Sequence, residues 1–213
     1  MSTTKVVCFD LDGTLILGYD ATSITLACSI NGHREEMLQI EDGRMKGEYD
    51  WIAADYKKAA LLKGLPVEKL LREFPRGICP IDGIVQTVEA LHQRGIKCLL
   101  VTSGPVESAQ SVASLWGLDA WDGSRYGVTD GIFDGTLPGH IGDQGKITCV
   151  ERFCRPLGIS LSQVTAVGDG GTDIPLFGRC GCSIAINYGP EAEGKATHYL
   201  RTDTLTDVLP LIP

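Results

Sequence analysis

The chain has 213 residues, of which 43% are hydrophobic and 22% are charged, so it is long enough for one or two domains with a buried core. Acidic residues outnumber basic ones by 27 to 19, and the net charge of -8 argues against a broad surface for nucleic acid or anionic membrane. Because no 18 consecutive residues are apolar and the first residues lead directly into a strand-like run, we expect no membrane span and no signal peptide.

The first predicted element is a strand at residues 6–9, an apolar run without a polar face, as in a strand buried on both sides of a parallel sheet. Asp10 and Asp12 follow it, and the chain breaks at Gly13. Both carboxylates therefore lie at the carboxyl end of the strand, where open α/β sheets bind ligands. Two acids this close repel each other unless a cation or a shared proton compensates them. The alternative interpretation is an ordinary Asp-Gly turn.

Residues 15 to about 75 read as several helices rather than as one crossover connection. The expected helices are Asp20 to about Ile30 with Asp20 as its cap, Glu35–Met45, Trp51–Lys63 and Pro66–Glu73. Pro75, Gly77 and Pro80 then mark a linker back to the sheet. The pattern predicts a helical cap placed over the carboxyl end of the sheet.

The rest of the chain alternates apolar strand-like runs with helical patterns. Further strands are predicted at residues 96–101, 164–167 and 183–186, with helical spacing before 95 and before 158 and a β-hairpin at 127–135. This alternation predicts an α/β fold, a doubly wound, Rossmann-like parallel sheet with helices on both faces. We assign residues 1–14 and 76–213 to this core domain and 15–75 to the helical cap domain.

Polar turns follow three of the predicted strands. Thr102 and Ser103 come after the second, and Asp169 and Asp173 come after the third. Because parallel strands bring these turns to one edge, four aspartates and two hydroxyls should meet there. Such crowded carboxylates call for a hard divalent cation, and Mg²⁺ takes carboxylate, phosphate and water oxygens.

The set Asp10-x-Asp12-Gly-Thr, Thr102 after a strand, Lys146 and Gly168-Asp169-Gly-Gly-Thr-Asp173 resembles the haloacid dehalogenase superfamily, and within it the phosphoserine phosphatase-like branch. The likeness spans residues 5–18 and 78–212, and the segment 61–66 extends it into the cap. It implies a Mg²⁺-dependent phosphatase that hydrolyses a small phosphorylated metabolite through a phosphoaspartyl intermediate.

The resemblance also implies a role for each acid. Asp10 would be the nucleophile, and Asp12 would protonate the leaving group and then activate water. Asp10, the backbone carbonyl of Asp12, and Asp169 would hold Mg²⁺. Asp173 would orient the metal ligands or Lys146.

Three residues are implied in phosphate binding. Thr102 and the amide of Ser103 would hold phosphate oxygens, and Lys146 would supply a positive charge. Taken alone, Lys146 reads as a solvated lysine in the first turn of a helix.

Substrate choice depends on the cap. Phosphoserine phosphatases similar to this chain carry a Glu after the Asp motif and an Arg before the Leu-Leu-Lys segment, where this chain has Tyr19, next to Asp20, and Lys58. Neither replacement is equivalent, because Tyr cannot pair with an ammonium and Lys cannot bind a carboxylate in the bidentate way of Arg. The simpler interpretation makes Asp20 a helix cap and Lys58 a surface charge. Phosphoserine, phosphocholine, phosphoethanolamine, a sugar phosphate and a ketose intermediate of methionine salvage stay open as substrates.

Two other functions share these motifs. A phosphomutase or phosphotransferase would use the same aspartyl phosphate, and a non-catalytic regulatory protein could bind phosphate without turnover.

The eight cysteines form no C-x-x-C pair, so we expect buried free thiols and a cytoplasmic protein. We expect the scattered histidines to be solvated or capping rather than metal ligands: His33, His92, His140 and His198. The sequence does not set the oligomeric state.

Overall fold

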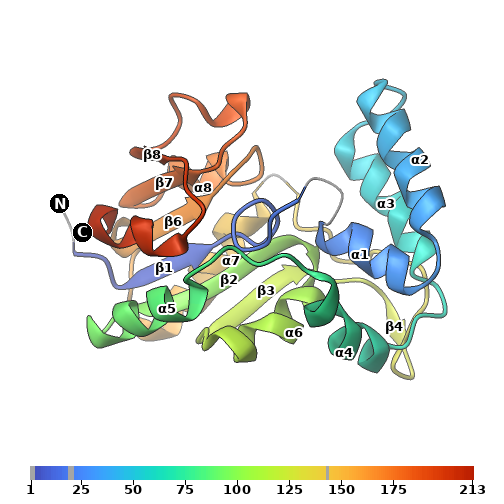
Figure 1. Cartoon of the computed structure of the whole chain (residues 1–213), viewed down its shortest axis with the longest axis horizontal. Helices are drawn as coiled ribbons and strands as arrows, with labels where there is room; N and C mark the ends of the chain where they lie inside the picture. Colours follow the sequence, from blue (N-terminus) through green and yellow to red (C-terminus); the bar gives the residue numbers. More distant parts are fainter. Residues whose placement is uncertain (1–2, 19–21, 143) are drawn as a thin grey trace.

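A computed structural model describes residues 3–18, 22–142 and 144–213. Its centre is a six-stranded sheet in the order β3-β2-β1-β6-β7-β8, and every neighbouring pair is parallel (Figure 1). The strands are β1 (Val6–Phe9), β2 (Lys97–Pro105), β3 (Ala120–Ser124), β6 (Val164–Gly168), β7 (Cys182–Ile186) and β8 (His198–Leu200). The four predicted strands are confirmed. The edge strands β3 and β8 were not predicted, since both lack a continuous apolar run.

The sheet is buried on both faces because its side chains alternate between two hydrophobic clusters. Val7 and Phe9 of β1 belong to one cluster, whereas Val6 and Cys8 belong to the other. The first face is covered by α5 (Ile84–Gln93) and α6 (Val106–Trp116), and the second by α7 (Gly145–Cys154) and α8 (Ile174–Phe177). The predicted doubly wound α/β fold is confirmed. Short 3-10 turns complete it at Arg155–Leu157, Leu161–Gln163, Pro190–Ala192 and Leu205–Leu211.

Four helices between β1 and α5 form what we call the helical insert, which lies beyond the carboxyl ends of the strands (Figure 1). They are α1 (Ser23–Ile30), α2 (Arg34–Met45), α3 (Trp51–Leu61) and α4 (Val67–Gly77). The four predicted helices are therefore present. The proposed division into core and cap domains at residues 14 and 76 stays a prediction, and one hydrophobic cluster runs from the sheet into the insert.

Two helix ends differ from the sequence-based expectation. Thr22 is the N-cap of α1 and accepts a hydrogen bond from the amide of Thr25, whereas Asp20, the expected cap, lies outside the described residues. Helix α4 continues through Pro75 to Gly77, where we expected a linker. Proline removes only one helical hydrogen bond, and the fully buried Phe74 packs this last turn against the core.

The chain enters and leaves the insert along two adjacent segments. The amide of Leu17 donates to the carbonyl of Cys79 at 2.7 Å, and the amide of Ile81 donates to the carbonyl of Leu15 at 3.0 Å. Two hydrogen-bonded connecting segments therefore join the insert to the carboxyl edge of the sheet.

The predicted hairpin is confirmed as β4 (Val128–Thr129) and β5 (Ile132–Phe133), which pair antiparallel. It also binds the turn between α3 and α4, since the amide of Gly64 donates to the carbonyl of Phe133 at 2.9 Å. The insert is thus attached to the core at a second place.

The expectation of buried free thiols is met by six of the eight cysteines. All eight cysteines are free; Cys79 is exposed and Cys180 is half-buried, while the other six are buried as expected. In the described part of the chain, no helix combines the length and apolar character needed to cross a bilayer.

Candidate active site

Asp10 is the first residue after β1 and is buried at the carboxyl end of the sheet. The ammonium group of Lys146, from the first turn of α7, donates to Asp10 Oδ1 at 2.5 Å and to Asp173 Oδ1 at 2.7 Å. Lys146 is only 2% exposed, so the alternative of a solvated lysine is wrong. A buried lysine between two acids compensates part of their charge.

The positive charge of Lys146 faces three acids here, of which Asp10 and Asp173 are buried and Asp169 is half-buried. Carboxylate oxygens of Asp10, Asp169 and Asp173 all lie within 4.8 Å of one another. Burial and the neighbouring carboxylates raise the pKa of Asp10 well above its ordinary value, although Lys146 opposes the shift. Burial, together with Asp173, raises the pKa of Asp169 to about 7. This excess of carboxylate oxygens is the donor chemistry of a hard divalent cation.

The close approach of Asp169 depends on Gly13. This glycine has φ of +80°, and a Cβ atom on it would lie 2.2 Å from Asp169 Oδ2. The Asp-Gly break that ends the first strand therefore also makes room for the acid that follows β6.

Asp12 turns away from the other acids toward the start of α1. Its Oδ1 accepts a hydrogen bond from the amide of Ser23 at 2.5 Å, and its Oδ2 accepts one from the Ser23 hydroxyl at 2.6 Å. Burial raises the pKa of Asp12 and the hydrogen bonds from Ser23 oppose that shift. Sequence reasoning missed Ser23, because the predicted helix starts at Asp20 and already includes it; the Thr-Ser pair directly before Ile24 was the available signal.

The end of β2 supplies the polar groups expected to face a phosphate. Thr102 is fully buried, and its hydroxyl accepts a hydrogen bond from the amide of Gly104 at 3.0 Å. The buried hydroxyl of Ser103 has no hydrogen-bond partner among the described residues. Ser103 lines the same cavity as Asp10 and Asp12, so its unsatisfied hydroxyl is a polar group that a ligand in the cavity could bond.

Four of these residues border a cavity of about 780 Å³, whereas the buried Thr102, Lys146 and Asp173 are not among the residues that line it. Asp10, Asp12, Ser103 and Asp169 line its core side, so the predicted convergence of the strand ends is confirmed for these residues. Helices α1, α2 and α3 of the insert line the opposite side. A volume of this size suits a small-molecule site.

The specificity candidates have different outcomes. Tyr19 and Asp20 lie outside the described residues. Lys58 lines the cavity from α3 and is only 5% exposed, so the interpretation of Lys58 as a surface charge is wrong. Its ammonium group forms ion pairs with Glu41 and Asp55, two acids that sequence reasoning missed. They lie 17 and 3 residues before Lys58, and only the packing of α2 on α3 brings Glu41 to it.

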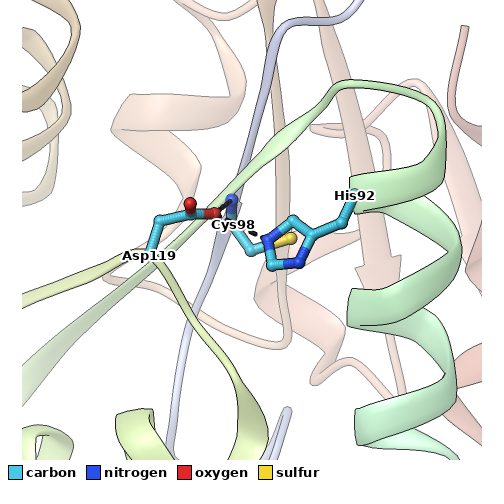
Figure 2. Close-up of side chains that lie close together, drawn as sticks. All are labelled: His92, Cys98 and Asp119. Carbon is cyan, nitrogen blue, oxygen red and sulfur yellow. Dashed lines mark hydrogen bonds and ion pairs between the residues drawn. The ribbon is translucent and has the colours of Figure 1, made fainter.

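A second group of possible metal ligands, His92, Cys98 and Asp119, lies at the opposite end of β2 (Figure 2). Asp119 Oδ2 accepts hydrogen bonds from the Cys98 amide and from His92 Nε2, both at 2.8 Å, and Oδ1 accepts one from Lys97 at 2.7 Å. Burial raises the pKa of the Cys98 thiol to about 12, which disfavours the thiolate that binds metal. These bonds account for the cluster as a structural link between α5, β2 and the turn before β3.

Comparison with known proteins agrees with this geometry. Residues 4–181 match the family model described as haloacid dehalogenase-like hydrolase. The chain is 29% identical over 209 residues to the phosphoserine phosphatase of Methanocaldococcus jannaschii, covering 98% of this chain and 97% of that protein. It is 30% identical over 207 residues to the phosphoserine phosphatase of Saccharomyces cerevisiae, covering 96% of this chain and 66% of the relative. A solved structure described as a phospho-aspartyl intermediate analogue of phosphoserine phosphatase superimposes with a TM-score of 0.83 at 29% identity, over the whole of both chains.

Proposed function

The chain belongs to the haloacid dehalogenase-like hydrolases, in their phosphoserine phosphatase-like branch, and on this premise we propose that it is a Mg²⁺-dependent phosphomonoesterase with Asp10 as its nucleophile. The observation that carries the proposal is the position of Asp10, which is buried at a strand end, bonded to Lys146 and close to two further acids. Its second neighbour along the chain, Asp12, faces the same cavity.

The proposed reaction has two steps. Lys146 bonds Asp10 Oδ1, so Oδ2 is the oxygen that attacks phosphorus, and the bond between phosphorus and the leaving-group oxygen breaks. Asp12 gives its proton to that oxygen. In the second step Asp12 takes a proton from water, and the resulting hydroxide displaces phosphate from Asp10.

The remaining residues orient the phosphate and balance charge. Asp10, the backbone carbonyl of Asp12, and Asp169 would hold Mg²⁺, which when bound offsets the negative charge of the phosphate and of the acids. Asp173 fixes Lys146 by the 2.7 Å hydrogen bond. Thr102 and Ser103 lie near the carboxyl end of β2, where the side chain of Thr102 and the amide of Ser103 would hold phosphate oxygens.

The helical insert is proposed to act as the cap that recognises the leaving group. It supplies the second wall of the cavity, and it joins the core through the two connecting segments. L-Phosphoserine is the first substrate to test, because the reported relatives are named phosphoserine phosphatases.

The test is phosphate release from p-nitrophenyl phosphate and L-phosphoserine, with Mg²⁺ and with excess EDTA. We expect hydrolysis with Mg²⁺ and loss of activity in EDTA that added Mg²⁺ restores. Full activity in EDTA would contradict the metal assignment, and no hydrolysis of any phosphomonoester would contradict the function. Transfer of phosphate to an added sugar or alcohol in preference to water would instead identify a phosphomutase or phosphotransferase.

A further inference from the structure

The insert wall of the cavity contains a lysine whose ammonium group already forms ion pairs with carboxylates of the protein. Lys58 of α3 is buried, and its ammonium group contacts Glu41 Oε1 of α2 and, at 3.1 Å, Asp55 Oδ1 of its own helix. Burial acts to lower the pKa of Lys58, but Asp55 and Glu41 outweigh it and the pKa is raised. Lys58 therefore carries its proton and is held by two carboxylates.

The second oxygen of each carboxylate is also bonded. Glu41 Oε2 accepts from Arg44 Nε at 2.8 Å, and Asp55 Oδ2 pairs with His140 Nε2 at 3.1 Å. His140 Nδ1 accepts the amide hydrogen of Gly142 at 2.8 Å, which leaves the ring proton on Nε2. Two cations, Arg44 and Lys58, thus pair with the two anions, and His140 ends the network through its bond to Asp55. His140 is not solvated, since its side chain is only 7% exposed, but its bond from the Gly142 amide fits the expected alternative of a capping histidine.

This network is unsuited to the carboxylate of an amino acid. Glu41 and Asp55 take up two of the three N–H groups of Lys58, so a substrate carboxylate that bonded the third would lie beside two protein carboxylates, and like charges repel. The first turn of α1 carries no acid, so it offers no carboxylate to a substrate ammonium group. On the described part of this wall both cations that line the cavity, Lys58 and Arg44, already bond protein carboxylates, so a substrate carboxylate finds no cation that serves it alone.

The same wall suits a neutral leaving group with several hydroxyls. A hydroxyl can donate to a bonded carboxylate and accept from a nearby donor without bringing a further charge into the network. Trp51 lines the cavity, with its ring 5.0 Å from the ring of His140, and gives an aromatic surface for C–H groups. The hydroxyl-bearing residues Thr22 and Thr25 line the wall beside it.

We propose that the network Arg44–Glu41–Lys58–Asp55–His140 selects phosphomonoesters with an uncharged, polyhydroxylated leaving group, such as a polyol or sugar phosphate, over phosphorylated amino acids. This inference rests on the proposed phosphatase function. It makes Glu41 and Asp55 specificity-determining residues, because they occupy the cation that would otherwise bind a substrate carboxylate.

The first experiment compares kcat/KM of the unmodified protein for sorbitol phosphate, glycerol phosphate, glucose phosphate and L-phosphoserine, with p-nitrophenyl phosphate as the reference. We expect the best polyol or sugar phosphate to exceed phosphoserine by about tenfold or more. Equal or higher kcat/KM for phosphoserine overturns the inference and leaves the phosphatase function intact. No hydrolysis even of p-nitrophenyl phosphate overturns the function, and the inference with it.

The second experiment releases Lys58 by the double substitution Glu41→Gln and Asp55→Asn. The freed ammonium group should raise the kcat/KM ratio of phosphoserine to the best polyol or sugar phosphate by about tenfold. Asp42→Asn is the matched control, because Asp42 lies on α2 next to Glu41 and forms an exposed pair with Lys46. The kcat/KM ratio of this control variant should not change. An unchanged ratio in the folded double variant, or in Glu41→Gln alone if the double variant does not fold, overturns the role of the network.

Discussion

Lys146→Met tests whether this lysine compensates the buried acids of the site. Methionine has a similar length and suits a buried position, but it removes the ammonium group that bonds both Asp10 and Asp173. Removing one partner of a buried ion pair costs about 3–5 kcal/mol, because the remaining charge is left without compensation. We therefore expect the free energy of unfolding to fall by about that amount in EDTA at neutral pH.

The matched control is Lys97→Met. Lys97 also pairs with an acid, Asp119, at 2.7 Å, but its side chain is 52% exposed. Exposed ion pairs contribute only about 0–1 kcal/mol, so the control should lose little stability. The same change thus separates a buried compensating charge from a solvated one.

The assay is urea denaturation of both variants and the unmodified protein, with EDTA and with Mg²⁺. A cation that binds only the folded state stabilises it by about 2.7 kcal/mol at one hundred times its Kd, so Mg²⁺ should offset part of the loss in Lys146→Met. A loss in Lys146→Met no larger than in Lys97→Met would refute the reasoning, because the three acids would then need no internal cation.

In the unmodified protein, rapid acid quenching with radiolabelled substrate should trap phosphate bound to the protein, and Asp10→Asn should abolish both this phosphate and turnover. Retention of either would exclude Asp10 as nucleophile. Ser23→Ala removes the 2.6 Å hydrogen bond to Asp12 and should lower kcat by about tenfold or more, since hydrogen bonds to charged groups contribute about 1.5–3 kcal/mol. An unchanged kcat would mean that Asp12 is positioned without the hydroxyl. Gly13→Ala should weaken Mg²⁺ binding measured by calorimetry, because its Cβ would lie 2.2 Å from an oxygen of the metal-site carboxylate. Gly95→Ala is the control with a similar φ of +72° and open space around it, and equal Mg²⁺ affinity in the two variants would contradict the steric argument.

The sequence determined the fold class and pointed to the acids that the proposed reaction uses. Apolar runs at the strand positions and helical spacing between them leave few arrangements other than a doubly wound sheet. Parallel strands then bring Asp10, Ser103 and Asp169 to the same edge, whatever the details of packing. The helix end at Pro75 was misplaced because tertiary packing of Phe74 outweighs a local proline signal.

Only the tertiary structure decided how charge is distributed around the cavity. Nothing in the local sequence of Lys58 distinguishes a surface lysine from a buried one, since Glu41 comes from another helix and His140, bonded to Asp55, from a loop 85 residues farther along the chain. The same holds for Lys146, because the acids that its charge compensates, Asp10 and Asp173, lie 136 and 27 residues away in the sequence. The hydrophobic pattern that predicts strands and helices depends on neighbouring residues, whereas the compensation of buried charges depends on which distant side chains the packing brings together.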